Sequence, residues 1–268
     1  MKFVAAAVQM LAGNDKRANL QEATRWVRDA AAKGARLVAL PEVFIWRGSK
    51  KLERQFAEPI PGPSSTALAE LARELGIYLL GGSILEAISD SERAYNTSLL
   101  FDPAGKQIAC YRKIHLFDVD LANGVSLRES QTRAHGESCA VVKTELGTIG
   151  LSVCYDVRFP ELYRKLANQG AEVIFVPSAF TAYTGEAHWE TLLRARAIEN
   201  QTYVIAPDQF GKSANSFETY GHSMIVDPWG KIIAELPDGP GVISAIIDLD
   251  FLAKVRAELP ALNHRRLT

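Results

Sequence analysis

The sequence has few cysteines, no long apolar run and no surplus of either charge. Its 268 residues include three cysteines, and 30 basic residues stand against 31 acidic ones, for a formal net charge of −1. With a pI near 6.5, the chain lacks the basic surplus that a general nucleic-acid or anionic-membrane binder needs. No stretch reaches the roughly 18 apolar residues of a membrane helix, so we expect neither nucleic acid nor membrane as a partner.

Cysteine usage bears on metal binding and on compartment. The three cysteines are Cys110, Cys139 and Cys154. Their spacing matches no CxxC or zinc pattern, and a sparse, odd set favours a reducing compartment. The start of the chain has Lys2 before an apolar run, as in a signal peptide, but the run is short and Gln9 interrupts it. We interpret it as a buried strand and expect a cytoplasmic protein with no metal and no organic cofactor.

Apolar residues make up 47% of the chain, which is ample for a large core. Strand-like and helix-like patterns alternate along it, and no Gly/Ser-rich linker divides it, so we expect an α/β fold in one domain over residues 1–268. Residues 115–133 are irregular and polar, which is typical of a pocket-forming loop. Helices are expected at 14–33, 64–75, 159–168, 187–200 and 250–259. Strands are expected at 3–9, 36–40, 78–85, 95–102, 106–112, 148–154, 173–176, 202–206, 223–227, 231–235 and 242–248.

Two pairs of segments look alike between the first and second parts of the chain. An apolar strand that follows Gly-Ala and ends in proline occurs at 34–41 and again at 170–177. An Asp-Pro-x-Gly turn follows each of them, at 102–105 and at 227–230. Unless common turn motifs coincide here, the order indicates two similar halves facing each other as two mixed sheets back to back.

Glu42 is the first candidate for chemistry, because it follows a predicted strand and has apolar neighbours. A carboxyl group in such surroundings is desolvated and can serve as a general base. The alternative is a carboxylate that turns outward after Pro41.

Lys113 is the second candidate, at the end of the strand predicted over 106–112. Side-chain alternation places Arg112 and Lys113 on opposite faces, so one of them points inward unless the strand ends first. The alternative is a basic pair on the solvated surface.

Cys154 is the third and most specific candidate, because a strand is predicted to end there and a helix to begin near Pro160. A thiol at such an elbow lies near unpaired backbone N–H groups, and we expect the local field to favour the thiolate. The alternative is a small buried hydrophobic residue.

The three candidates and their flanking segments together resemble the nitrilase superfamily of carbon–nitrogen hydrolases. The matching segments are LPEVF at 40–44, YRKIHLFDVD at 111–120, GLSVCYDVRFPELYRKLANQGAEVIFVPSAF at 150–180, AHWETLLRARAIENQTYV at 187–204 and YGHSMIVDPWGKIIA at 220–234. They cover nearly the whole chain in the right order and are most similar to the Nit branch. The resemblance implies a four-layer α-β-β-α sandwich of two mixed sheets with the helices outside.

The resemblance also implies the roles of individual residues. Glu42 would be the base, Lys113 the cation and Cys154 the nucleophile, with Glu129 as a supporting carboxylate. Without the resemblance, Glu129 would be read as a loop carboxylate in solvent. The N–H of Tyr155 would join Lys113 in stabilising the oxyanion.

Substrate contacts are expected after the nucleophile and after the strand at 173–176. Arg158 would bind a substrate carboxylate, unless it pairs with Asp156 or Glu161 instead. Side chains that would line the pocket, or else only pack within their loop, are Phe180, Tyr183 and Thr184. His188 is expected to have a structural duty.

The resemblance implies hydrolysis of a small 2-oxo acid amide, with deaminated glutathione as the favoured substrate and 2-oxoglutarate and cysteinylglycine as products. The three central residues do not separate this activity from an omega-amidase acting on 2-oxoglutaramate-like amides, a nitrilase or a carbamoylase. A scaffold that has lost catalysis and a thiol-dependent acyltransferase are further alternatives. Family likeness also implies a homodimer, with residues 259–268 reaching the partner unless they form a frayed tail.

Overall fold

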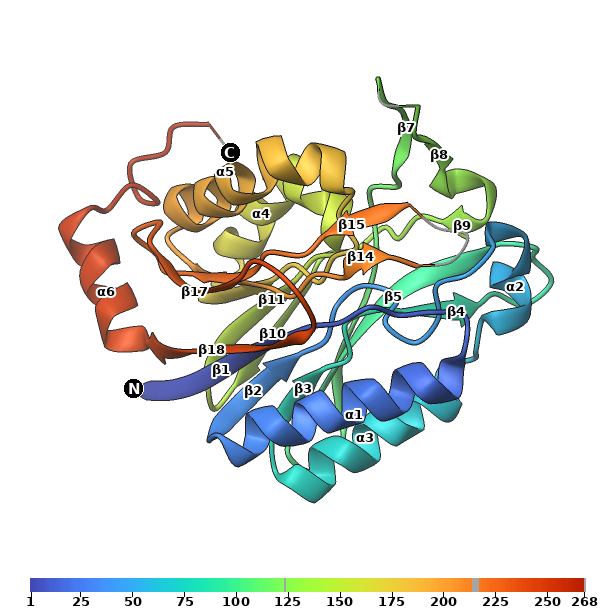
Figure 1. Ribbon diagram of the computed structural model, residues 1–268. Coiled ribbons are helices and arrows are strands. Elements are labelled where there is room, and N and C mark those ends of the chain that lie inside the picture. Colours follow the sequence, from blue (N-terminus) through green and yellow to red (C-terminus); the bar gives the residue numbers. More distant parts are fainter. Residues whose placement is uncertain (123, 214–216, 268) are drawn as a thin grey trace.

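The computed structural model describes residues 1–122, 124–213 and 217–267 and shows helices outside two facing β-sheets (Figure 1). This arrangement confirms the expected four-layer α-β-β-α sandwich. Thr268, the last residue of the tail expected to reach a partner, lies outside the described residues. No helix in these three ranges is both long and apolar enough to cross a bilayer.

The first sheet has parallel strands at its centre and antiparallel strands towards its edges. β1 pairs with β2 and β2 with β3 in parallel, whereas β18 and β5 join antiparallel. Its order is β18 (Gly241–Asp248), β1 (Lys2–Gln9), β2 (Ala35–Ala39), β3 (Tyr78–Leu80), β5 (Ala94–Phe101) and β4 (Ile84–Ala87), with β6 (Gln107–Arg112) and β9 (Arg133–Ala134) also on β5. The chain start is therefore a strand, as predicted.

The second sheet is mixed in the same way. β11 to β13 run parallel, and β10, β16 and β17 are antiparallel. Its order is β10 (Ala140–Thr144), β11 (Gly147–Leu151), β12 (Val173–Phe175), β13 (Tyr203–Ala206), β16 (Ser223–Val226) and β17 (Ile232–Leu236). Two short antiparallel ribbons, β7 (Asp118–Asp120) with β8 (Ser126–Arg128) and β14 (Phe210–Lys212) with β15 (Glu218–Tyr220), stand apart from both sheets.

Each sheet is covered on its outer face by two helices. Helices α1 (Lys16–Ala32) and α3 (Pro63–Leu75) contact the first sheet, and α4 (Pro160–Asn168) and α5 (Ala182–Asn200) contact the second. α1 begins where the Asp15 side chain accepts the Ala18 N–H, and Val27 lies on its buried face. The other helices are α2 (Glu53–Phe56), α6 (Leu249–Glu258) and the 3-10 turns η1 (Lys50–Leu52), η2 (Glu129–Gln131) and η3 (Cys154–Arg158).

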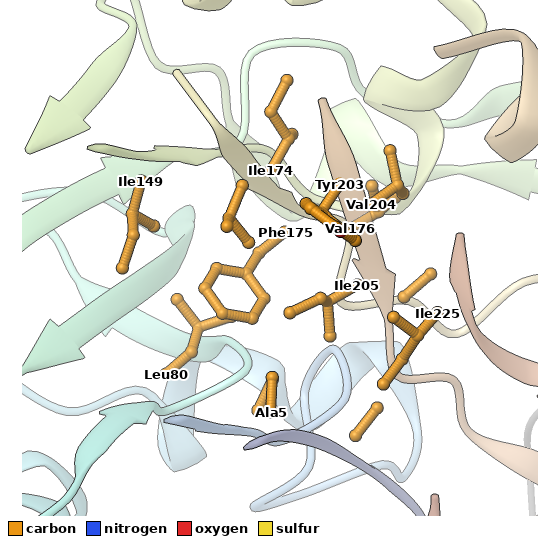
Figure 2. Close-up of a cluster of buried hydrophobic side chains, with 14 of the residues drawn as sticks. Ala5, Leu80, Ile149, Ile174, Phe175, Val176, Tyr203, Val204, Ile205 and Ile225 are labelled. Carbon is orange, nitrogen blue, oxygen red and sulfur yellow. The ribbon is translucent and has the colours of Figure 1, made fainter. Parts of the chain in front are cut away.

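The two sheets pack through apolar side chains that alternate inward along the strands. Figure 2 shows Ala5 and Leu80 of the first sheet facing Phe175 and Ile205 of the second. All four are fully buried. Burying a side chain the size of Leu or Phe is worth about 1.5–3 kcal/mol, so this layer holds the loops at the strand ends in fixed positions.

The similar segments in the sequence form equivalent structures in the two halves. Asp102 and Asp227 each accept two backbone N–H groups within the turn, at 2.9 Å, in the β5–β6 and β16–β17 connections. β2 and β12 each follow a glycine with positive φ, Gly34 or Gly170. The predicted relation between the halves therefore holds at both pairs of segments.

Most predicted boundaries differ by one or two residues, and three elements differ by three or more residues or by a break. The strand expected over 78–85 is interrupted at Gly82, which has φ +51°, and a Cβ there would meet the Pro41 carbonyl oxygen at 2.0 Å. α5 begins at Ala182 rather than 187, after Thr181 in extended conformation. β11 ends at Leu151, three residues before the thiol, because the chain turns out of the sheet there.

Candidate active site

Cys154 lies in a strained turn between β11 and α4. It is the first residue of η3 and has φ +48°, a conformation that costs a non-glycine residue about 1–3 kcal/mol. Its N–H donates to the Pro177 carbonyl at 3.0 Å. The buried Asp156 carboxylate accepts the Val153 N–H and the Tyr111 hydroxyl, at 2.8 and 2.7 Å, and so fixes the turn. Strain of this kind, fixed by its surroundings, is typical of a functional residue.

Glu42 follows β2 and points inward rather than to solvent, with 3% of its surface exposed. Its Oε1 accepts from Asn96 Nδ2 at 2.7 Å and from Lys113 Nζ at 2.9 Å. Its Oε2 accepts the Ala179 N–H at 2.9 Å. Three donors from separate segments therefore hold this carboxylate in one orientation.

Lys113 is the inward member of the basic pair at the end of β6. It is 2% exposed, whereas Arg112 reaches the surface and pairs with Glu86. The Lys113 ammonium donates to both oxygens of Glu129, at 3.1 and 2.9 Å, in addition to Glu42. The ammonium is thus fixed between two carboxylates.

Glu129 is buried and is itself held by groups beyond Lys113. Arg133 Nη1 donates to its Oε1 at 2.6 Å, and the Phe117 N–H donates to its Oε2 at 2.7 Å. Arg133 also bonds both oxygens of Glu53. A chain of alternating charges therefore runs from Glu53 to Glu42.

Neighbouring charges outweigh burial in setting the ionisation of this chain. Burial alone would lower the pKa of the Lys113 ammonium, but Glu129 and Glu42 raise it above its usual value. Burial would raise the pKa of Glu129, but Lys113 and Arg133 lower it to about 2. Both groups are therefore charged at neutral pH.

The sequence led us to expect a thiolate at Cys154, and the structure contradicts this. Burial, followed by the Glu42 charge, raises the pKa of the thiol well above its usual value, and Lys113 and the Ala179 N–H only partly oppose this. The resting sulfur is therefore a thiol. Attack on an electrophile requires a base beside it, and Glu42 is close enough to affect its ionisation.

A cavity of about 420 Å³ brings together all four residues for which catalytic roles were predicted, namely Glu42, Lys113, Glu129 and Cys154. Phe117 and Leu127, from the loop predicted to form a pocket, also line it. No group of His, Cys, Asp and Glu side chains within residues 1–122, 124–213 and 217–267 has an arrangement that could hold a metal ion.

A second, smaller cavity of about 10 Å³ adjoins Cys154 on the side of α5. Four of the residues for which substrate contacts were predicted line it, namely Tyr155, Arg158, Phe180 and Thr184. The guanidinium of Arg158 lies 5.1 Å from the Phe180 ring centroid. The structure does not bring Tyr183 to either cavity, because its side chain is 49% exposed.

Arg158 does not pair with Asp156 or Glu161. Its Nη1 lies 3.2 Å from His188 Nδ1, and burial lowers the pKa of its guanidinium. His188 lies within α5 and is exposed, and this contact with Arg158 is compatible with the structural duty expected of it. In the described part of the chain no carboxylate forms an ion pair with Arg158, because Asp156 is bound by His115 and the Val153 N–H instead.

Sequence reasoning missed several residues that hold the site. Asn96 orients Glu42, and its position as a buried amide within the apolar strand β5 was the available signal. Arg133 pairs with Glu129 four residues earlier, a spacing that could have indicated the contact. The N–H of Ala179 left no signal in the sequence, because it depends on backbone geometry.

Comparisons with known proteins agree with this geometry. A model of the carbon–nitrogen hydrolase family matches residues 4–257. A deaminated glutathione amidase from Synechocystis is 44% identical over 266 residues, covering 98% of both chains. The omega-amidase NIT2 of Xenopus tropicalis is 43% identical over 265 residues, which are 99% of this chain and 95% of that protein.

Solved structures give the same result. The crystal structure of Saccharomyces cerevisiae Nit3, a member of branch 10 of the nitrilase superfamily, has a TM-score of 0.90 at 37% identity and covers 99% of this chain and 97% of that one. Family match, sequence identity and fold all extend over nearly the whole chain. The chain therefore belongs to the carbon–nitrogen hydrolases of the nitrilase superfamily.

Proposed function

We propose that this enzyme hydrolyses the amide of a small 2-oxo acid through a thioester on Cys154. The observation that carries the proposal is the convergence of a strained thiol, an oriented carboxylate and a buried ammonium on one cavity. An amide is a poor electrophile with a poor leaving group. It therefore needs a strong nucleophile, a proton donor for the nitrogen and charge stabilisation at the oxygen.

Glu42 moves the proton in both halves of the reaction. It takes the proton of the Cys154 thiol as sulfur attacks the carbonyl carbon, and gives it to the nitrogen as the C–N bond breaks. The amine leaves, and the acyl group remains as a thioester. Glu42 then deprotonates a water molecule that attacks the thioester, which releases the acid and restores the thiol.

Two donors are suited to stabilise the oxyanion. The Lys113 ammonium is fixed beside Cys154, and the Tyr155 N–H lies in the first turn of η3, where N–H groups have no intrahelical acceptor. Losing one such donor typically costs on the order of 10²–10³ in rate. Glu129 acts through Lys113 as a positioning residue.

Arg158 is the proposed anchor of the 2-oxo acid carboxylate. A guanidinium can bind a carboxylate in a bidentate manner, and the rings of Tyr155 and Phe180 lie beside it. The name of the Synechocystis relative supports deaminated glutathione as the substrate, cleaved to 2-oxoglutarate and cysteinylglycine.

An omega-amidase is the second candidate, because the Xenopus tropicalis relative with that name is nearly as similar. It would act on 2-oxoglutaramate-like amides and release ammonia. Both candidates share the proposed thioester and differ in the leaving group.

A substrate panel tests the proposal. Deaminated glutathione, 2-oxoglutaramate, a nitrile and a carbamoyl compound would be assayed for 2-oxoglutarate, ammonia and cysteinylglycine. We expect 2-oxoglutarate from one or both amides, and cysteinylglycine in equal amount from the first. Turnover of only the nitrile or the carbamoyl compound would refute the proposed substrate class.

A further inference from the structure

One buried carboxylate, Asp156, connects the nucleophile turn to the end of β6. Asp156 is fully buried and lies in η3, two residues after Cys154. Its Oδ2 accepts the Val153 N–H at 2.8 Å and the Tyr111 hydroxyl at 2.7 Å. Its Oδ1 accepts the backbone N–H of His115 at 3.1 Å and lies 2.7 Å from Nδ1 of the same residue. Three of the four groups that meet this carboxylate therefore come from outside the turn.

The His115 ring donates from Nδ1 and is held in its plane. A carboxylate can only accept a hydrogen bond, so the ring nitrogen that faces Asp156 carries the proton. The ring stacks on Phe159, with 3.7 Å between the centroids and 6° between the planes. Because this stacking fixes the plane of the imidazole, it also fixes the direction of the Nδ1–H bond.

Alternate residues at the end of β6 serve both sides of the catalytic site. Tyr111 and His115 bind Asp156. Lys113 lies between them in the sequence and donates to the carboxylates of the large cavity. Side chains two residues apart point to the same side of an extended chain. One short segment therefore sets the position of the Lys113 ammonium and, through Asp156, that of the turn that carries Cys154.

The turn needs this support because Cys154 has φ +48°. A backbone conformation of that kind persists only when the surrounding structure holds it. Pro177 accepts the N–H of Cys154, and Asp156 binds the turn through the Val153 N–H. A displacement of a reacting atom by about 1 Å can cost about 100-fold in rate. Loosening Asp156 should therefore slow the attack of the sulfur without weakening substrate binding.

We propose that His115 is a positioning residue for the nucleophile. Its Nδ1–H holds Asp156, and Asp156 holds the turn so that Cys154 faces the carbonyl carbon beside Lys113. Tyr111 shares this role at the other oxygen of Asp156. Neither His115 nor Tyr111 lines either cavity at the active site, so both act through Asp156 rather than on the substrate. The inference rests on the proposed function, because it takes Cys154 as the nucleophile.

Two substitutions of His115 separate its hydrogen bond from its ring packing. His115→Phe keeps a ring for the stack on Phe159 but has no donor, whereas His115→Asn loses the ring and keeps an N–H donor near the position of Nδ1. In steady-state kinetics with a 2-oxo acid amide, we expect His115→Phe to lower kcat about 10- to 100-fold with little change in KM. His115→Asn should stay within about 3-fold of the wild type, because the bond to Asp156 is kept.

The rate at which iodoacetamide alkylates Cys154 gives a second measurement that needs no amide substrate. It should fall in His115→Phe and be largely retained in His115→Asn. His222→Phe is the matched control, because His222 stacks on Tyr220 and its Nδ1 lies 2.7 Å from Glu235, but it lines neither cavity at the active site. This control should leave kcat, KM and the alkylation rate unchanged.

The outcomes separate this inference from the proposed function. A wild-type kcat in His115→Phe, or an equal loss in His115→Asn, would overturn the inference and leave the amidase in place. Turnover that persists in Cys154→Ser would overturn the proposed function, and the alkylation rates would still test the positioning. If circular dichroism shows that His115→Phe does not fold, Tyr111→Phe decides. It removes one hydroxyl and should lower kcat about 3- to 10-fold, so wild-type rates there would contradict the inference.

Discussion

The two halves of the molecule share one topology but supply different chemistry at their strand ends. β2 is followed by Pro41 and Glu42, whereas its equivalent β12 is followed by Pro177 and Ser178, whose carbonyl oxygen accepts the Glu42 N–H at 3.3 Å. Two further groups come from strands that are not equivalent, because β6 leads into Lys113 in the first half and β11 leads into Cys154 in the second. The first half thus contributes paired charges, and the second a neutral thiol in a strained turn.

This difference indicates which part of the catalytic site each half supplies. The charges of the first half alternate in sign from Glu53 to Glu42, and each has at least one ion-pair partner that holds it in the buried site. The thiol of the second half has no ion-pair partner of its own and depends on Glu42 across the interface between the sheets. Neither half is competent alone, and substitutions on the two sides should fail differently.

Removing the nucleophile of the second half should have the largest effect. Cys154→Ser should lower kcat/KM on the order of 10⁴-fold or more, because a hydroxyl is a far weaker nucleophile with this base. Amide turnover and circular dichroism would be measured together. Cys110→Ser is the control, since Cys110 lies outside both cavities at the active site, and a similar loss there would contradict the assignment.

Neutralising Glu42, the base supplied by the first half, should cause the second-largest loss of activity. Glu42→Gln keeps the shape and can retain the bond from either Asn96 or the Ala179 N–H, which meet different oxygens of Glu42, but it cannot take the thiol proton. We expect kcat to fall on the order of 10³-fold, within the range of lost general acid–base catalysis. Rapid alkylation of Cys154 that is unchanged in this variant would show that another group deprotonates the sulfur.

Glu129→Gln should weaken the first half without removing a reacting group. We expect kcat to fall about 10- to 100-fold with little change in KM, because Lys113 loses one of its two anchors. The substitution should also change how the free energy of unfolding depends on pH.

The sign of the pH effect follows from the lowered pKa of Glu129, which moves from a reference of 4.5 to about 2 in the folded state. Its contribution, on the order of 3 kcal/mol, is present above pH about 4.5 and is lost as the pH falls towards 2. Denaturant titrations should therefore show a shallower acid decline for Glu129→Gln. The exposed Glu137→Gln control should decline like the wild type.

The smallest effect is expected at the carboxylate anchor of the second half. Arg158→Leu should raise KM for a 2-oxo acid amide about 10-fold and change kcat little, because the guanidinium contacts a part of the substrate that does not react. Arg158→Lys should recover part of the loss as a single charge without the bidentate geometry. A fall in kcat with no change in KM would show that Arg158 does not bind the substrate carboxylate.

The local sequence pattern predicted those helices and turns whose form depends on their own residues alone. The periodic residues before Gly34 gave α1 to within two residues at the start, and the two Asp-Pro-x-Gly turns predicted the relation between the halves. The early start of α5 and the break at Gly82 were missed. Both depend on packing against distant segments, such as the carbonyl of Pro41.

The site was predictable only in part for the same reason. Glu42, Lys113 and Cys154 each stand at a strand end, where a sequence pattern marks them. Asn96 and the Ala179 N–H act through tertiary contacts, and the thiol is protonated because burial and Glu42 oppose its charge. The homodimer, the cytoplasmic location and the single domain stay predictions.

Partitioning of the acyl group between water and hydroxylamine tests the thioester on Cys154 most directly. Two amides of the same 2-oxo acid with different leaving amines would be hydrolysed with added hydroxylamine, and hydroxamate and free acid would be quantified. A common thioester predicts the same hydroxamate-to-acid ratio for both amides, with no product from Cys154→Ser. A ratio that depends on the leaving amine, or product formed without the thiol, would contradict the account.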